Sequence, residues 1–291
     1  MKVSIIQNCL NGEKYLEKSL NSINDQTYQN YELIFLDNCS NDRSKEILEK
    51  FKNSKFKYYK TEKKLKLYEA RNLAISKSNG EYIAFLDVDD WWEPSKLFEQ
   101  VQVLNKNIEV DVVYSNYYIF NENSKLKKKN SQKKLPSGFI LNDLIKEYKI
   151  GILTTILRSE IFFKQNIWFD PSFTILGDYD FFLRIAKNKN FFYINKCLAN
   201  YRNHNSNYSI LNFTEELKEF EYFSNKPEIK NLISIDQISD LQKYYTDNKE
   251  RLLKLENINR NINNLSSKPI SINKVLKLIY YNFKKKISRI L

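Results

Sequence analysis

The sequence predicts an α/β protein with a mostly parallel, Rossmann-like sheet covered by helices on both faces, followed by a helical C-terminal extension. The sheet is predicted because short apolar segments alternate with segments of helical periodicity through residues 3–114. One of these segments, residues 82–86, carries no charge at all, which is typical of a strand buried on both faces. Polar sequence with apolar residues near helical spacing predicts helices in residues 212–265. We therefore divide the chain into a domain of residues 1–210 and an extension of residues 211–291.

Each element of the domain follows from its own pattern, in chain order. Strands are expected at residues 3–6, 31–36, 56–59, 82–86 and 110–114. Helices are expected between them, after Gly12, after Asp42, over residues 68–77 and from Pro94. A further strand is predicted at residues 151–158. The last helix of the domain begins near Asp178, which can cap it, and would pair Asp180 with Arg184 at i,i+4 spacing.

The charge balance favours anionic partners. The chain has 47 Lys+Arg against 35 Asp+Glu, a net charge of +12, which suits nucleotides, nucleic acid or an anionic membrane surface. Lysines are dense in residues 125–134, where either a solvated loop or an anion-binding role is consistent with the sequence. Nucleic-acid binding is not expected, because no aromatic residues are interleaved with these lysines.

Cysteine and histidine usage excludes some classes of protein. Cys9, Cys39 and Cys197 are odd in number and form no CxxC pattern, so we expect three free thiols in a reducing compartment. His204 is the single histidine, which argues against a Ser-His or Cys-His hydrolase. We find no signal-peptide pattern and no apolar segment long enough to span a bilayer. The expected location is the cytoplasm, peripheral at most on the inner face of the plasma membrane.

Short polar residues gather directly after the first, second and fourth predicted strands. They are Asn8 and Asn11, Asp37 and Asp42, and Asp87, Asp89 and Asp90. Ligands of parallel α/β sheets bind outside the carboxyl ends of the strands, so these three clusters should line one site.

Asp87 and Asp89 follow a buried strand at a spacing of two residues. If the strand continued through them, both side chains would point the same way and could share one target. Two converging carboxylates favour a cation between them, and hard oxygen ligands suit Mg2+ or Mn2+. The alternative is a solvated turn before a capped helix.

The chain has five glycines and contains neither of the Gly-rich phosphate-binding motifs, GxxxxGK[ST] and GxGxxG. Any bound phosphate must therefore be held by cationic side chains and a metal ion. Arg71, near the start of a predicted helix, is the best candidate for a diphosphate contact, since its planar fork matches phosphate oxygens. An exposed helix arginine paired with a carboxylate is the alternative.

Four blocks in order resemble one known family. Residues 3–6 with Asn11, and residues 36–42, 70–72 and 85–90, are similar in order and spacing to the family 2 glycosyltransferases, which have the GT-A fold. The resemblance implies an inverting glycosyltransferase that moves a sugar from a nucleoside-diphosphate-sugar to a hydroxyl of a glycan or lipid-linked acceptor, in the assembly of cell-surface polysaccharide. A UDP-sugar is the favoured donor, and Mn2+ or Mg2+ the implied cofactor.

The resemblance also implies roles for single residues. Asn11, Asp37, Arg71 and Asp87 would bind the nucleotide-sugar, and Asp89 would hold the metal on its diphosphate. Residues 176–184 resemble the Glu-Asp-x-Asp element whose second residue is the catalytic base, which maps to Asp178. Residues 201–204 resemble a Tyr-Arg-x-His element near the donor diphosphate, so His204 would contact phosphate or metal, a surface histidine being the alternative.

Four positions depart from the family's usual pattern. Asn8 stands in place of Pro, Asn38-Cys39 in place of Asp-Gly, and Gly177 in place of Glu; Tyr68-Glu69 also lacks a glycine often found before the Ala-Arg-Asn element. These departures bear on the identity of the nucleotide more than on the fold.

Two alternatives to sugar transfer are kept. A nucleotidyltransferase also needs carboxylates and metal but usually has a Gly-rich N-terminal signature, which is absent here. A non-catalytic scaffold would bind membrane or nucleic acid through its basic surface. The amphipathic, basic residues 271–291 could lie on an anionic membrane or pack on protein.

Overall fold

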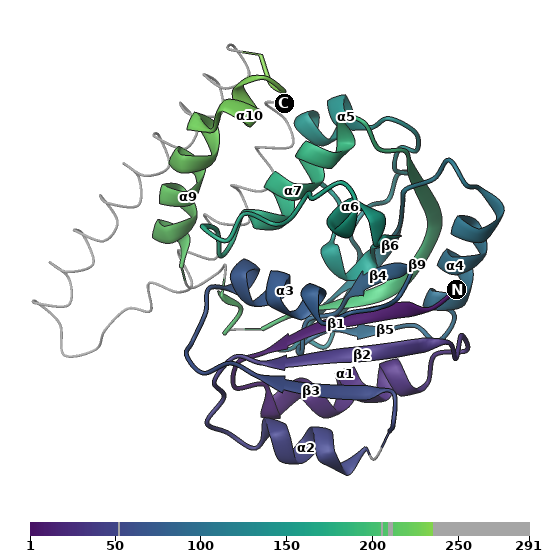
Figure 1. Ribbon diagram of the computed structural model, residues 1–291, viewed down its shortest axis with the longest axis vertical. Helices are drawn as coiled ribbons and strands as arrows, with labels where there is room; N and C mark the ends of the chain where they lie inside the picture. The colour runs from purple at the N-terminus through teal and green to yellow at the C-terminus, as the bar shows by residue number, and fades with distance from the viewer. Residues whose placement is uncertain (52, 205, 209–211, 235–291) are drawn as a thin grey trace, which may run out of the picture. The chain divides into compact units, whose positions relative to one another are not determined.

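The computed structural model describes residues 1–51, 53–204, 206–208 and 212–234 (Figure 1). Its strands are β1 (Val3–Cys9), β2 (Tyr31–Asp37), β3 (Phe56–Lys60), β4 (Tyr82–Phe85), β5 (Trp91–Trp92), β6 (Val112–Asn121), β7 (Lys127–Lys129), β8 (Ile156–Arg158) and β9 (Phe191–Asn203). Its helices are α1 (Glu13–Asn24), α2 (Ser44–Lys50), α3 (Leu67–Ser76), α4 (Lys96–Lys106), α5 (Leu141–Lys146), the 3-10 helix η1 (Ile152–Thr154), α6 (Glu160–Phe163), α7 (Gly177–Ala186), α9 (Phe213–Asn225) and α10 (Pro227–Lys230).

The strands form one mixed sheet in the order β3-β2-β1-β4-β8-β6-β9-β5, with β7 paired to β6. Pairing is parallel from β3 through β4 and again between β6 and β9. β8 is antiparallel to both of its neighbours, and the short β5 and β7 are antiparallel to β9 and β6. The prediction of a mostly parallel sheet is confirmed.

Helices cover both faces of the sheet, as the sequence predicts. In Figure 1, α3 lies on one face of β1 and β2, whereas α1 and α2 lie on the other. The helical periodicity of α1 places Leu16, Leu20 and Ile23 in the core, where all three are fully buried. Burial of β1, β2 and β4 on both faces explains why their sequences are apolar runs without alternation.

The predicted strand at residues 151–158 is only partly correct. Its first half forms η1, because the hydroxyls of Thr154 and Thr155 bond to the carbonyls of Gly151 and Ile152 at 2.7 and 2.8 Å and favour a turn. Only Ile156–Arg158 forms a strand, β8. β9 was not predicted at all, since its sequence mixes apolar and polar residues irregularly, and its partner β6 is distant in the chain.

Two compact units divide the chain, each described by itself. The first consists of residues 1–140 and 149–204 and contains the whole sheet; the second includes α5, α9 and α10. α9 and α10 lie in the predicted extension, and a boundary at residue 210 stays a prediction. The part of the predicted helical region beyond residue 234, including the amphipathic tail of residues 271–291, lies outside the described residues.

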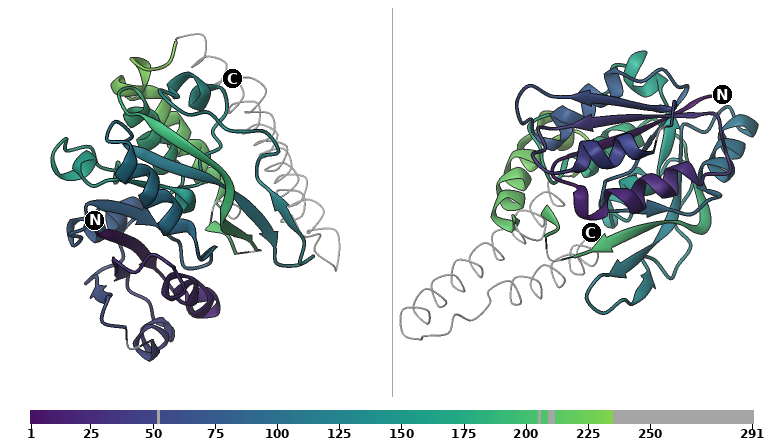
Figure 2. Two further views of the ribbon diagram at one scale, coloured as in Figure 1. Left: turned by 90° about the vertical axis from the view of Figure 1, so that its right-hand side faces the viewer. Right: turned by 90° about the horizontal axis from the view of Figure 1, so that it is seen from below.

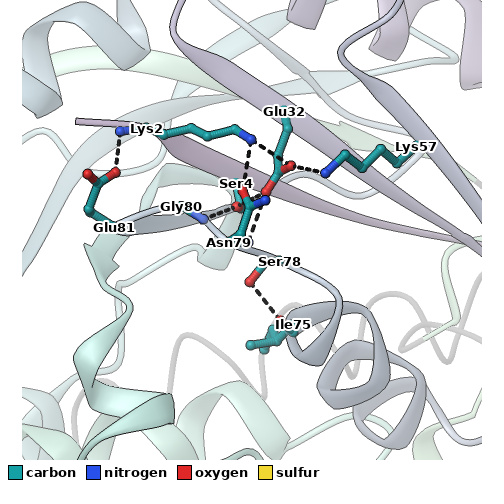
Figure 3. Close-up of polar contacts among 9 residues, drawn as sticks. All are labelled: Lys2, Ser4, Glu32, Lys57, Ile75, Ser78, Asn79, Gly80 and Glu81. Atoms are coloured by element: carbon teal, nitrogen blue, oxygen red, sulfur yellow. Dashed lines mark hydrogen bonds and ion pairs between the residues drawn. The ribbon is translucent and has the colours of Figure 1, made fainter.

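A buried carboxylate joins the first three strands at the edge opposite the predicted site (Figure 3). Glu32 of β2 is 1% exposed, and its Oε1 accepts hydrogen bonds from Ser4 Oγ at 2.6 Å and from the Asn79 N–H at 3.0 Å. Its Oε2 accepts from Lys57 Nζ at 2.6 Å and Lys2 Nζ at 2.9 Å. Burial by itself would raise the pKa of Glu32, but the bonds from Lys57, Ser4 and Lys2 lower that pKa to about 2.

This arrangement makes stability depend on pH. Because the folded-state pKa of Glu32 lies below its ordinary value of 4.5, its stabilisation is complete above that value and is lost as the pH falls toward about 2. We expect Glu32→Gln to lower the free energy of unfolding at pH 7 by about 2–3 kcal/mol. The difference from wild type should shrink at pH 3. Urea denaturation at both pH values, with the exposed Glu49→Gln as control, measures it; a pH-independent difference would contradict the assignment.

Candidate active site

Polar loops follow β1, β2 and β4 at the same edge of the sheet, because β1 pairs in parallel with both other strands. Two of these loops are joined directly. The Asn11 N–H donates to Ser40 Oγ at 3.0 Å, and Asn11 Oδ1 accepts the Asn41 N–H at 2.9 Å. Asn11 therefore lies at the predicted edge, where its side chain fixes the loop after β2; its contact with a donor stays a prediction.

Asp37, the last residue of β2, is 2% exposed and holds the loop that follows it. Its Oδ1 accepts the Ser40 N–H at 2.7 Å, and its Oδ2 accepts the hydroxyl of Tyr58 at 2.8 Å. Burial, followed by this bond to Asp37, raises the pKa of Tyr58 far above its ordinary value, so the phenol stays a donor. The carboxylate is thus fixed in orientation before any ligand arrives.

Cys39 has a left-handed backbone, with φ of +65°. It stands where the family pattern commonly has glycine, the residue that adopts this conformation without strain. Its Sγ lies 3.3 Å from the carbonyl oxygen of Thr61, a weak contact. Cys39 therefore differs from the glycine of the family pattern in its side chain but has the backbone conformation that glycine favours.

We expect Cys39→Gly to be more stable than Cys39→Ala by about 1 kcal/mol, the usual cost of a left-handed conformation for a residue with a Cβ. At an ordinary loop position the alanine variant would be the more stable of the two, because glycine has the larger entropy when unfolded. Urea denaturation of both variants provides the measurement. An alanine variant as stable as the glycine variant would show that the backbone at Cys39 is not strained.

Asp87 does not lie in a strand, which corrects one premise of the sequence analysis. β4 ends at Phe85, and Asp87 begins a turn in which its carbonyl accepts the Asp90 N–H at 3.1 Å. The alternation of strand side chains therefore does not explain why Asp87 and Asp89 are neighbours. Burial and the Asp89 carboxylate raise the pKa of Asp87, although the charge of Arg71 opposes them.

Arg71 is 2% exposed, so the expectation of an exposed helix arginine is wrong, while the paired carboxylate is present. Its Nη2 donates to Asp87 Oδ1 at 2.7 Å. The rings of Tyr68, Phe85 and Phe169 lie within 6 Å of the guanidinium, at 5.1, 5.7 and 5.9 Å. Against the effect of burial, the charges of Asp87, then Tyr68 and then Asp178 raise its pKa, so both carboxylates act on the guanidinium.

His204 meets Asp89 across 115 residues of sequence. Its Nε2 lies 3.0 Å from Asp89 Oδ2, its side chain is 5% exposed, and its ring packs on Tyr15 with centroids 4.7 Å apart. The alternative of a surface histidine is therefore wrong. Asp89 and His204 bring a carboxylate oxygen and an imidazole nitrogen to one point, which are ligand types for a divalent metal.

The turn that carries Asp89 is anchored to the end of β9. Arg202 Nε donates to the carbonyl oxygen of Asp89 at 2.8 Å, and the Arg202 N–H donates to Asp90 Oδ1 at 2.8 Å. Asp90 is 2% exposed, and burial, followed by the charges of Asp89 and Asp87, raises its pKa well above the ordinary range. Sequence reasoning placed Asp90 in the cluster but missed this anchoring, which depends on the unpredicted strand β9.

Asp178 is not the cap of its helix, which corrects the capping alternative. α7 begins at Gly177, the cap position is Leu176, and Leu176 makes no side-chain capping bond. Asp178 Oδ1 accepts the Tyr179 N–H at 2.8 Å and remains half-buried in the first turn. Capping is therefore not what requires a carboxylate at position 178.

Asp180 has a structural role. It is fully buried, and its Oδ2 lies 2.8 Å from Arg184 Nη2 and accepts from Arg184 Nε at 2.9 Å. The predicted i,i+4 pair is confirmed. A carboxylate held this way is a poor candidate for a base that must reach a substrate, which favours Asp178 over Asp180.

Gly177 and Tyr68, which both depart from the family pattern, are neighbours in the structure. A Cβ on Gly177 would lie 2.4 Å from Cδ2 of Tyr68, so the ring of Tyr68 occupies the space that a larger residue at position 177 would need. Tyr68 is 3% exposed, and burial, followed by the charge of Asp178, raises the pKa of its phenol. Sequence reasoning missed Tyr68 as a neighbour of the candidate base, although the missing glycine and the missing Glu were the signal.

Comparisons with known proteins show which family the chain resembles. Residues 4–163 match the model of the family described as Glycosyl transferase family 2. The chain is 35% identical over 193 residues to the UDP-Glc:alpha-D-GlcNAc-diphosphoundecaprenol beta-1,3-glucosyltransferase WfgD of Escherichia coli, covering 66% of this chain and 73% of that protein.

Two solved structures share the fold. Staphylococcus aureus TarS in complex with UDP-GlcNAc has a TM-score of 0.65 at 21% identity, over 84% of this chain and 72% of that one. The mannosyltransferase PcManGT from Pyrobaculum calidifontis, solved with GDP-Man and Mn2+, has a TM-score of 0.62 at 13% identity, over 99% of this chain and 83% of that one.

Proposed function

Because this chain belongs to glycosyl transferase family 2 and has the GT-A fold, we propose that it is an inverting, metal-dependent transferase acting in the assembly of a cell-surface polysaccharide. It takes a sugar from a nucleoside-diphosphate-sugar and transfers it to a hydroxyl of a glycan or lipid-linked acceptor. A UDP-sugar is the favoured donor, since the Escherichia coli relative is named for UDP-Glc and the Staphylococcus aureus structure holds UDP-GlcNAc. The lipid-linked acceptor follows from the diphosphoundecaprenol in the name of that relative.

One observation carries the proposal. Asp87 and Asp89 follow one strand at the carboxyl edge of the sheet, and each is held by its own partner, Arg71 and His204. Asp178 lies within electrostatic range of the same Arg71. These contacts support a site in which carboxylates for the donor lie near one that accepts the proton.

The loops after β1 and β2 would bind the nucleoside half of the donor. Asp37 and Asp87 would bind base and ribose, and Asn11 would border them. Arg71 is buried, and its guanidinium donates a hydrogen bond to Asp87. We therefore assign it chiefly to orienting that carboxylate. A direct contact between Arg71 and the departing diphosphate stays a prediction.

Asp89 and His204 fit a divalent cation bound partly by substrate. In the described part of the chain no group of three or more His, Cys, Asp or Glu residues gathers at one point. Mg2+ and its relatives are usually held by one or two protein ligands together with substrate phosphates, so two donors suffice. When bound there, Mn2+ or Mg2+ stabilises the charge that develops on the leaving diphosphate. His204 would act as a ligand through Nε2, the ring nitrogen that faces Asp89.

Asp178 is the proposed base, accepting the proton of the acceptor hydroxyl during transfer. The bond from the Tyr179 N–H keeps the carboxylate oriented without neutralising it. Attack by that hydroxyl on the face opposite the leaving diphosphate inverts the anomeric carbon. Tyr68, packed beside Gly177, limits the space around the base.

Incubation with a panel of UDP- and GDP-sugars, with and without Mn2+, tests the function. Release of nucleoside diphosphate, or hydrolysis of one donor, is the expected result. Release of pyrophosphate would support the nucleotidyltransferase alternative, and no turnover with any donor would support the scaffold. Mass analysis of products formed on a glycolipid extract would identify the acceptor.

We also propose that the protein attaches peripherally to the inner face of the plasma membrane, because the proposed acceptor is linked to a lipid. Among the helices in the described ranges, none is both long and apolar enough to cross a bilayer. The basic tail of residues 271–291 is one candidate for attachment, and it lies outside the described residues. Packing of that tail on protein remains its alternative.

A further inference from the structure

A hairpin made of β6, β7 and their connecting turn, called the cationic hairpin below, borders the candidate site: Glu122 of its turn accepts the hydroxyl of Tyr15 at 2.9 Å, and the ring of Tyr15 packs on His204. It extends outward at the edge of the sheet (Figure 2). Its turn is ordered by Asn121, whose Oδ1 accepts the N–H groups of Asn123 and Ser124 at 3.1 and 2.9 Å. The Asn121 N–H donates to the carbonyl of Leu126 at 2.9 Å, which holds Leu126 at the tip with 71% of its surface exposed.

Cations surround this exposed leucine. Lysines occupy positions 125, 127, 128, 129, 133 and 134, and residues 123–134 contain no carboxylate. The sequence alone left open whether this stretch is a solvated loop. The structure shows instead that Lys127–Lys129 form β7 and pair with Tyr118–Phe120 of β6, so the charges are arrayed on a strand with fixed spacing.

One face of the hairpin continues into a layer of cations on aromatic rings. Trp91 and Phe120 meet edge to face with centroids 5.5 Å apart. Lys18 Nζ lies 3.5 Å from the centre of the Trp91 ring, and Arg202 Cζ lies 4.8 Å from it. Lys18, Lys125 and Arg202 all lie within 6 Å of the Phe120 ring, at 5.8, 5.9 and 5.9 Å.

This crowding of like charges costs free energy unless an anion offsets it. Burial, followed by the charges of Arg202 and Lys127, lowers the pKa of Lys18. Glu93 offsets part of the repulsion, with its Oε1 3.6 Å from Lys127 Nζ. The surface therefore has a strong positive potential that complements a dense array of phosphates.

We propose that the cationic hairpin docks on an anionic lipid bilayer, with Leu126 entering the interface and the lysines beside it contacting headgroup phosphates. A bilayer fits better than a soluble phosphate compound, because Lys125 and the strand Lys127–Lys129 flank a leucine that is 71% exposed, and an exposed apolar tip between cations suits a membrane interface. The inference rests on the peripheral membrane attachment proposed above and assigns a surface to it, and it holds whatever sugar is transferred.

Co-sedimentation of the full chain with vesicles tests the proposal. Vesicles of phosphatidylglycerol and phosphatidylcholine are compared with pure phosphatidylcholine at 150 mM salt. Replacing Lys125, Lys127 and Lys128 together with Gln should lower the partition coefficient on anionic vesicles about 10²-fold, since each lysine near such a surface contributes roughly fivefold. Leu126→Ser, which leaves the charge unchanged, should lower it several-fold.

A matched control removes the same charge elsewhere. Lys50, Lys63 and Lys64 are exposed lysines away from the hairpin, and their joint replacement by Gln should change the partition far less. Equal losses in both triple variants would overturn the proposal, because only net charge would then matter. So would unchanged vesicle binding in the hairpin variant combined with weaker binding of inorganic pyrophosphate, which would assign the patch to a soluble anion. Sedimentation needs no turnover, so failure of the proposed function would not affect the result.

Discussion

Replacing Asp178 with Asn is expected to slow sugar transfer by about 10²–10⁴-fold while leaving nucleotide affinity unchanged. A carboxylate with an ordinary pKa of ~3.9 is a weak base toward a free sugar hydroxyl. That weakness is tolerable, because the hydroxyl proton becomes acidic only as its oxygen bonds to an oxocarbenium-like carbon. The base therefore acts late, and its position matters more than its strength. Asn keeps the shape and can still accept the Tyr179 N–H, so the change removes little beyond the proton acceptor.

Three measurements characterise this variant. The transfer rate is measured at saturating donor, the affinity for the nucleoside diphosphate by calorimetry, and the stability by thermal unfolding. Asp180→Asn is the control, since it breaks the buried pair with Arg184 and should lower stability by about 3–5 kcal/mol. Near-normal transfer by Asp178→Asn would refute its role as base. If Asp180→Asn lost transfer at intact stability, the base would be Asp180.

Replacing Asp89 with Asn is expected to abolish the dependence of donor binding on Mn2+. Asn keeps one oxygen but removes the charge that holds a hard cation. Even the loss of a residue that only supports a ligand usually weakens metal binding 10–100-fold, so removal of the carboxylate should weaken it by at least about 10²-fold. Calorimetry of the nucleoside diphosphate with and without Mn2+ measures the effect directly, without turnover.

Glu49→Gln provides the control, because that carboxylate is exposed on α2 and pairs with Lys45 at 3.6 Å, outside the Asp89 turn. It should leave the difference between metal-loaded and metal-free affinity unchanged. An Asp89→Asn protein whose donor affinity still rises with Mn2+ as in wild type would show that the metal lies elsewhere. His204→Ala should reduce the same difference less severely, since the carboxylate remains.

Local pattern was sufficient to predict the first half of the fold. Strands β1 to β4 and the helices between them follow from short-range periodicity, and the parallel sheet places their polar loops at one edge. The pairing of Arg71 with Asp87 and of His204 with Asp89 could not be derived this way. Each depends on which elements meet in space, and the sequence analysis named neither pair: it gave Arg71 as a diphosphate contact, and His204 as a phosphate or metal contact implied by the resemblance.

The errors share a physical cause. The strand predicted at residues 151–158 failed because two threonine side chains bond to nearby carbonyls, a local competition that apolar content does not reveal. Asp178 was offered as a cap because short polar residues favour that position, yet the helix begins one residue earlier. β9 was missed because a long strand with a register shift against β6 loses the alternation by which strands are recognised.

The anchoring of the Asp89 turn by β9 also sets the order in which the protein can become competent during synthesis. β1 to β4 and the loops for the nucleoside emerge from the ribosome first, and these strands pair with one another within residues 3–85. Arg202 and His204, which hold Asp89 and Asp90, emerge more than 110 residues later. A nascent chain halted before them contains Asp87, Asp89 and Asp90 and the pair of Arg71 with Asp87, but lacks the contacts that Arg202 and His204 make with Asp89 and Asp90. Contacts of such sequence separation form late, so donor binding should arise only when translation has passed residue 204.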